Sequence, residues 1–178
     1  MDQNTQKKIN ISTEMKKFNG GKNGIEGFYM APNHPKVNSY LLTIFNDLIQ
    51  NYNLDGLHLD YVRFHDSDYG QNPIALNNFQ KEIGVSDLNS FNASQSSQWN
   101  DYRRKAVTDL VRETKNLIQS VKPNIILTAA VKPNLYQARE RFFQEWDVWL
   151  AAGYLDKAIA MNYTKDLKDF AANIDIMY

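Results

Sequence analysis

The sequence predicts an α/β fold in which strands and helices alternate, as in a TIM-type (β/α)8 barrel. Short apolar runs alternate along the chain with longer segments whose apolar residues recur at helical spacing. This order is typical of parallel strands joined by right-handed helical crossovers. A closed barrel has eight strands, and the 178-residue sequence shows about four strand–helix units. The chain is therefore expected to be a fragment of a barrel, a half barrel that pairs with another, or a small open α/β sheet.

Four segments are predicted to be strands, because each is a short apolar run bounded by polar residues or proline. In chain order they are residues 24–32, 55–63, 124–131 and 157–163. Residues 124–131 are almost continuously apolar, which is typical of a strand buried on both faces of a parallel sheet. The preceding residues 1–23 are polar and are expected to form an irregular lead-in, so that residues 24–178 make up the partial barrel domain.

The segments between and after these strands show the apolar spacing of helices. Helices are expected over residues 37–51, 99–120 and 137–152, and from Lys165 onward with Leu167 and Phe170 facing inward. Residues 64–98 form a long polar loop with two short helical pieces, near residues 73–83 and 86–91. Loops of this length are uncommon in compact domains unless they carry function.

The composition excludes several classes of partner and site. The 20 basic and 20 acidic residues balance, so no nucleic acid or anionic membrane surface is expected as a partner. Without cysteine the chain forms neither disulfides nor thiolate metal sites. No apolar run reaches the ~20 residues that span a bilayer, and the first residues carry no signal-peptide stretch. The 10 Tyr, 9 Phe and 3 Trp suit a sugar site but equally suit a core.

The segment DGLHLDYVR, residues 55–63, is the strongest candidate for a functional site. Because strand side chains alternate between two faces, the expected faces are Leu57, Leu59 and Tyr61 against His58, Asp60 and Val62. A charge on the inner face of an apolar strand is unfavourable unless it is paired or used. In barrels, polar residues at the C-terminal strand ends carry the chemistry. Asp60 is therefore the candidate catalytic residue; its alternative role is a structural cap for the following loop.

The C-terminal ends of parallel strands share one edge, where polar side chains are expected to converge. The candidate substrate-binding residues at this edge are His58, Tyr61, Arg63, Lys132, Asn134, Asn162 and Tyr163. Such a mixture of charged groups, amides and phenols binds polyhydroxylated substrates through many directional hydrogen bonds. The sequence has no glycine-rich phosphate loop, no Gly-x-Ser-x-Gly elbow and no His/carboxylate cluster at metal-ligand spacing, so no cofactor and no metal is predicted.

Glycoside hydrolysis fits this edge. It requires two carboxyl groups, ~5 Å apart in retaining enzymes and ~6.5–9.5 Å apart in inverting enzymes. Asp60 supplies one of them, as nucleophile or base, and Arg63 is expected to keep it ionised and oriented. Asp66 and Asp68, in the loop after the strand, are candidates for the partner acid, although loop carboxylates are more commonly just solvated.

Several motifs resemble a known family. Three of them are continuous: APNHPKV at residues 31–37, NYNLDGLHLDYVR at 51–63 and MNYT at 161–164. The other two are sets of spaced residues: Trp99 with Tyr102, Arg103 and Arg104, and Trp146 with Trp149, Gly153 and Asp156. In order and spacing they resemble the bacterial glycosyl-hydrolase-like barrel family whose members include division-associated peptidoglycan glycosidases. The sequence departs from the family pattern at Ala160, where proline is usual, and it lacks the family's early and last strands.

The resemblance implies a (β/α)8 barrel that cleaves glycosidic bonds of a bacterial polysaccharide, with denuded peptidoglycan glycan strands as a substrate. It implies that Asp60 is the catalytic carboxylate and that His58 faces the sugar, as a basic residue does in amylase-like barrels. A secreted, periplasmic or cell-envelope location follows from the same resemblance. The alternatives are a non-catalytic glycan-binding module or inactive fragment, and another barrel hydrolase such as a metal-dependent deacetylase or amidase. Half a barrel exposes apolar sheet edges, so self-association is also predicted.

Overall fold

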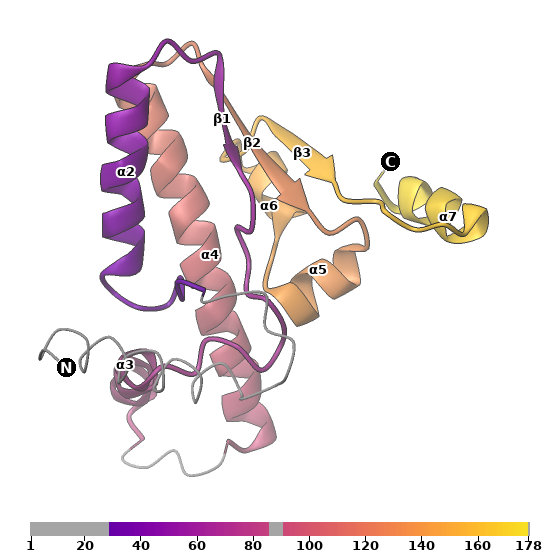
Figure 1. Cartoon of the computed structure of the whole chain (residues 1–178). Helices are drawn as coiled ribbons and strands as arrows, with labels where there is room; N and C mark the ends of the chain where they lie inside the picture. The colour runs from indigo at the N-terminus through magenta and orange to yellow at the C-terminus, as the bar shows by residue number, and fades with distance from the viewer. Residues whose placement is uncertain (1–28, 86–90, 178) are drawn as a thin grey trace, which may run out of the picture.

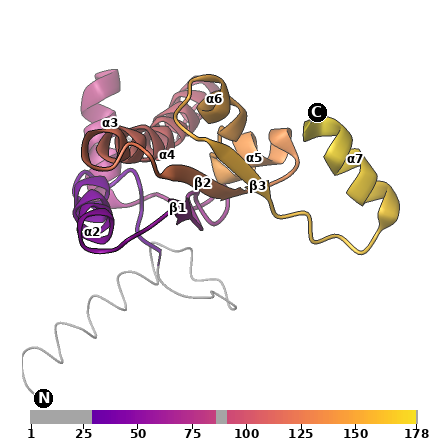
Figure 2. The same cartoon turned by 90° about the horizontal axis from the view of Figure 1, so that it is seen from above.

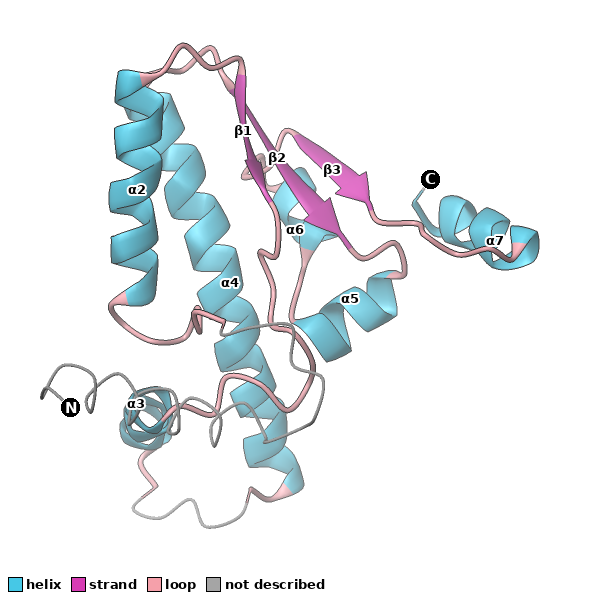
Figure 3. Cartoon of the chain, in the orientation of Figure 1, coloured by secondary structure: helices cyan, strands magenta, loops and turns pink. Residues whose placement is uncertain are grey.

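The computed structural model describes residues 29–85 and 91–177, and it shows a mixed α/β fold in which helices alternate with parallel strands. Figure 1 follows the chain from α2 to α7, and Figure 3 separates helices from strands by colour. In chain order the elements are α2 (Val37–Asn51), β1 (Gly56–Leu59), α3 (Pro73–Ile83), α4 (Ala93–Val121), β2 (Ile126–Val131), α5 (Leu135–Phe142), α6 (Trp146–Ala151), β3 (Lys157–Ala160) and α7 (Leu167–Met177).

The three described strands form one parallel sheet in the order β1-β2-β3. Leu57 is paired with Leu127 and His58 with Thr128, while Ala129 is paired with Ala158 on the other side of β2. The parallel arrangement predicted from the strand–helix order is confirmed, and the sheet is compatible with part of a TIM-type barrel. Of the strand expected at 24–32, residues 24–28 lie outside the described residues and residues 29–32 are not in a strand. The short helix expected near 86–91 falls largely on residues 86–90, which also lie outside them.

Helices cover one face of the sheet. Seen from above in Figure 2, α4 and α6 lie on the same side of the three strands. The sheet side chains on that face, including Leu59, Leu127 and Val131, are buried together with Val107 of α4 and Trp149 of α6. Burial of apolar surface at about 25 cal/mol per Å² is the main stabilising term of such a core. The alternation of side chains between the two faces of β1, predicted from the sequence, is therefore confirmed as far as Leu59.

The opposite face of the sheet is open. It carries His58 and Thr128, and Ile126 and Ile159 on this side are 41% and 50% exposed. The prediction that the strand at 124–131 is buried on both faces is therefore wrong for Ile126, because no described element covers that side. In a closed barrel the face turned away from the helices lines the interior.

Two predicted elements end earlier than expected, because the backbone turns at residues with positive φ. β1 stops at Leu59, since Tyr61 adopts a φ of 57°, and the alternation is reversed there: Tyr61 is 44% exposed and Val62 is buried. The single helix expected over residues 137–152 is broken into α5 and α6 at Phe143, whose φ is 55°. The helix expected from residue 99 instead begins at Ala93, because Asn92 and Gln95 form a capping box.

The C-terminal helix α7 lies on the far side of β3 from the rest of the fold in Figures 1 and 2. The expectation that Leu167 and Phe170 face inward is wrong, since these side chains are 84% and 40% exposed. Their helix has amphipathic spacing but no fully buried residue, and only Met177 at its end is partly buried against the core. Within the described part of the chain, no helix is long and apolar enough to cross a membrane.

Candidate functional site

Asp60 follows β1 directly and lies in solvent at the C-terminal end of the strand. Its Oδ1 accepts a hydrogen bond of 2.8 Å from the backbone N–H of Tyr61. The carboxylate therefore caps the turn, as the structural alternative requires, and it is also accessible to a ligand. Because Asp60 is exposed here, the argument that it is a costly buried charge does not apply to this structure.

His58 lies on the open face of the sheet, two positions before Asp60. Its Nδ1 is 2.7 Å from the Oγ1 of Thr128, the residue opposite it on β2. A hydrogen bond to one ring nitrogen orients the imidazole and leaves Nε2 for another partner. The structure thus brings a carboxylate and an oriented imidazole to the same end of β1.

Arg63 does not hold Asp60 as expected. Its guanidinium carbon is 4.5 Å from the centre of the Tyr61 ring, and its Nη1 donates weakly to the Phe64 carbonyl at 3.3 Å. Among the residues that the structure describes, no ion pair joins Arg63 to any carboxylate. The turn at Tyr61 swings the side chain of Arg63 towards aromatic rings instead.

Three cations surround the ring of Phe142 at the end of α5. The Nζ of Lys132 is 4.7 Å from the ring centre, and the guanidinium carbons of Arg63 and Arg141 are 5.3 and 5.2 Å from it. Cations are attracted to the negative face of an aromatic ring. One buried ring therefore gathers predicted site residues from the ends of β1 and β2.

Asp66 neutralises the third of these cations. Its two oxygens accept hydrogen bonds from Nε and Nη2 of Arg141 at 3.0 and 2.6 Å. This bidentate pair, aided by the Ser67 N–H, lowers the pKa of Asp66 to about 2. An ionised carboxylate cannot donate a proton, so Asp66 does not fit the role of general acid. Asp68 lies within electrostatic reach of both Arg103 and Arg141.

The remaining predicted residues lie at the ends of β2 and β3, and the side chains of two of them, Asn134 and Asn162, already have structural partners. Asn134 caps α5 by accepting the Gln137 N–H at 2.9 Å. Asn162 contacts α7, donating to the Phe170 carbonyl at 3.2 Å and accepting from Asn173 at 2.9 Å. Tyr163 is 84% exposed. None of these three is joined to Asp60 by a hydrogen bond among the described residues.

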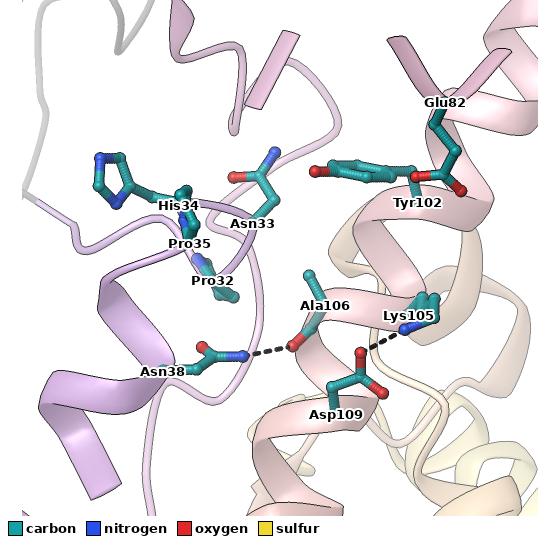
Figure 4. Close-up of a pocket in the computed structure, with 10 residues that line it drawn as sticks. All are labelled: Pro32, Asn33, His34, Pro35, Asn38, Glu82, Tyr102, Lys105, Ala106 and Asp109. Carbon is teal, nitrogen blue, oxygen red and sulfur yellow. Dashed lines mark hydrogen bonds and ion pairs between the residues drawn. The ribbon is translucent and has the colours of Figure 1, made fainter. Parts of the chain in front are cut away.

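Two pockets lie on either side of this edge. One, of about 360 Å³, lies between the loop after β2 and α7, and Lys132, Asn134 and Asn173 help to line it. The other, of about 200 Å³, is shown in Figure 4 between the start of α2 and the middle of α4. It holds none of the predicted site residues, and its floor includes the 2.6 Å Lys105–Asp109 ion pair. The first pocket is the one that continues the candidate site.

Sequence reasoning missed two buried polar residues beside the site. Arg103 is 4% exposed and donates to the carbonyls of Ser67 and Tyr69 in the loop after β1. Its position four residues from both Trp99 and Val107, on the apolar side of α4, was a usable signal. Gln144 is fully buried at the helix break after α5, and no sequence signal marks that break.

No group of three or more His, Asp or Glu side chains is placed to hold a metal ion within residues 29–85 and 91–177. Comparison with curated proteins found no match. The family model described as Glycosyl hydrolase-like 10 matches residues 4–178, which is nearly the whole chain. This match agrees with the family resemblance read from the motifs around Asp60. The chain belongs to the glycosyl hydrolase-like 10 family.

Proposed function

We propose that this chain contributes the catalytic edge of a glycoside hydrolase, with Asp60 as catalytic carboxylate. The observation that carries the proposal is an exposed carboxylate at the C-terminal end of a parallel strand, next to the oriented imidazole of His58. Barrel enzymes place their catalytic residues at this end of their strands. Family membership supports the same class of reaction.

In this proposal Asp60 acts as nucleophile or base at the anomeric carbon. The second carboxyl group that both stereochemical outcomes require is not Asp66, which Arg141 holds ionised. His58, Tyr61, Arg63 and Lys132 bind the sugar from β1 and β2, and Asn134, Asn162 and Tyr163 extend the site towards α7. The donors of this set match the hydroxyl and carbonyl oxygens of a polysaccharide.

The proposed substrate is a bacterial polysaccharide, with denuded peptidoglycan glycan strands as the favoured choice. N-acetylmuramic acid in those strands carries a carboxylate, and Arg63 and Lys132 share the Phe142 ring at the edge of the site. Guanidinium and ammonium groups bind carboxylates through charge-assisted hydrogen bonds. A secreted, periplasmic or cell-envelope location is part of the same proposal, because that substrate lies outside the cytoplasm.

Self-association is proposed as well. The open sheet face exposes Ile126 and Ile159, and β3 is an edge strand of the described sheet. Unpaired edges of this kind favour pairing with another chain. Light scattering that shows only a monodisperse monomer would count against association.

The alternative function is a glycan-binding module without catalysis. It is favoured by one observation, that Asp66, a candidate partner acid, is held ionised by Arg141. Calorimetric binding to glycan strands without any product would support this alternative.

The test compares Asp60→Asn with Asp55→Asn, a matched change at the opposite end of β1. Both side chains are exposed, so neither substitution threatens the fold. We expect Asp60→Asn to lose activity on denuded glycan strands by at least about 10²–10⁴-fold, the usual contribution of acid–base catalysis, while Asp55→Asn retains it. Equal product release by Asp60→Asn and the wild type would remove Asp60 from the mechanism.

A further inference from the structure

Gln144 is a fully buried polar side chain between the ends of β1 and β2. Its Oε1 accepts the backbone N–H of Lys132 at 2.8 Å, and its Nε2 donates to the carbonyls of Ala130 at 3.0 Å and Val62 at 3.4 Å. We propose that Gln144 is the positioning residue of the candidate glycan site, setting the spacing between the segment after Asp60 and Lys132. This inference rests on the proposed function.

The need for such a residue follows from the sheet. The β1–β2 pairing ends with Leu59 opposite Ala129. Beyond that pair the chain after Asp60 turns away, and the Val62 carbonyl and the Lys132 N–H have left the ladder. Buried backbone groups require partners, and a carboxamide offers both an acceptor and two donors. Gln144 thus replaces the missing ladder bonds where the two strands diverge.

The break between α5 and α6 places the carboxamide there. Phe143 adopts a φ of 55°, and the backbone N–H of Gln144 bonds back to the Ala138 carbonyl at 2.8 Å. A non-glycine residue keeps positive φ only where its surroundings hold it. The Phe143 ring is fully buried, with the guanidinium of Arg103 3.8 Å from its centre. This packing turns the chain so that the next side chain enters the gap between the strands.

The backbone of Lys132 is held from both directions. Gln144 accepts its N–H, and the indole Nε1 of Trp146 donates to its carbonyl at 2.9 Å. The side chain of Lys132 then lies over the Phe142 ring beside Arg63. Lys132 is the proposed sugar-binding residue that follows β2. Its orientation relative to the proposed sugar-binding residues of β1 is therefore set by Gln144, which does not contact the sugar.

Gln144→Glu tests this role with almost no change of shape. An ionised carboxylate accepts the Lys132 N–H but cannot donate to Val62 or Ala130, whereas a protonated carboxyl accepts it and donates its one O–H to one of those two carbonyls. Burial raises the pKa of a carboxyl group. The variant should therefore keep the native geometry at low pH, where it is protonated, and lose it as pH rises through the folded-state pKa. The matched control is Gln119→Glu, at an exposed position of α4 that is not part of the candidate site.

The experiment measures binding of a denuded peptidoglycan oligosaccharide by calorimetry at pH 5 and pH 8, each variant against the wild type at the same pH. We expect Gln144→Glu to bind about tenfold more weakly at pH 8, the equivalent of one lost hydrogen bond, and to recover at pH 5. Gln119→Glu should match the wild type at both values. Unchanged affinity of Gln144→Glu at pH 8, together with unchanged affinity of Gln144→Leu, which has no carboxamide at any pH, overturns the inference.

A second readout separates this inference from the proposed function. Hydrogen exchange of the Lys132 amide should be faster in Gln144→Leu, which offers no acceptor for that N–H, than in the wild type at the same pH. If the wild type binds no glycan, the proposed function fails, and the exchange result alone decides whether Gln144 holds Lys132. Equal protection of the Lys132 amide in Gln144→Leu and in the wild type would then refute the positioning role.

Discussion

Arg103→Met should loosen the loop that follows β1 and destabilise the whole domain. The guanidinium of Arg103 is 4% exposed and makes three short hydrogen bonds, to the carbonyls of Ser67 (2.6 Å) and Tyr69 (2.8 Å) and to Oδ1 of Asn100 (2.6 Å). Burial, with a smaller contribution from Arg104, lowers the pKa of Arg103 to about 9. The group is therefore still charged at pH 7, and its bonds are charge-assisted.

The expected loss of stability follows from what the substitution leaves behind. Methionine can fill much of the volume of the arginine stem, but it donates no hydrogen bond to the two loop carbonyls. A buried acceptor without a partner costs about 1–3 kcal/mol. The Tyr69 carbonyl is buried and the Ser67 carbonyl only partly so, and the expected decrease in the free energy of unfolding is about 1–3 kcal/mol from Tyr69 with a smaller addition from Ser67. This is a substantial share of the ~5–15 kcal/mol of a typical domain.

The assay is urea unfolding at pH 7, followed by circular dichroism, with Arg112→Met as control. Arg112 lies on the same helix, but its side chain is 39% exposed and its partners are Asp109 and Glu113. Exposed ion pairs contribute about 0.2–1 kcal/mol, so the control should stay within about 1 kcal/mol of the wild type. If the two variants unfold at the same urea concentration, the reasoning about buried acceptors is refuted.

Two further predictions use the same loop. Because the Arg141 pair lowers the pKa of Asp66 from 3.8 to about 2, its stabilisation is present above pH 4 and is lost as pH falls through about 2. Asp66→Asn should therefore lower the melting temperature at pH 7, by the equivalent of about 1 kcal/mol for an exposed bidentate pair, and should match the wild type at pH 2; a constant difference would contradict this. Gly70→Ala should cost about 1–3 kcal/mol more than Gly84→Ala in urea unfolding. Both glycines have positive φ, but an added Cβ meets a ring only at Gly70, where it would lie 2.5 Å from Cε1 of Phe64. Equal losses of stability in the two variants would show that the Phe64 ring moves aside.

Local patterns predicted much of the fold and the location of the site. Apolar spacing predicted a helix from Val37 to around residues 51–53, and α2 ends at Asn51. A short helical piece was predicted near residues 73–83, where α3 lies, and the alternation of strands with helices predicted parallel pairing. A polar residue at the end of an apolar strand singled out Asp60, which the structure places at the C-terminal end of β1. The predictions of the fold are confirmed because spacing and strand ends are properties of short segments; the role of Asp60 stays a prediction.

Other features depend on contacts between distant segments, and the sequence signals for them were weak or absent. The break at Phe143 has neither glycine nor proline, and it is held by Arg103, forty positions earlier on α4. The expected pairing of Arg63 with Asp60 did not occur, because the turn at Tyr61 carries the guanidinium over aromatic rings. The prediction that Leu167 faces inward is wrong, because helical spacing shows that one face of a helix is apolar but not that another element covers this face.

The sequence by itself determined the class of fold, the alternation of strands with helices and a carboxylate at the end of an apolar strand, since each depends on neighbours within a few residues. The tertiary structure decided which groups meet at that edge. It paired Asp66 with Arg141, 75 positions away, so that Asp66 does not fit the role of proton donor. It placed Arg63 and Lys132 at the same ring, that of Phe142. It also inserted Gln144 between two strands. The physical reason is that buried charges and backbone groups must find partners, and those partners are chosen by proximity in space.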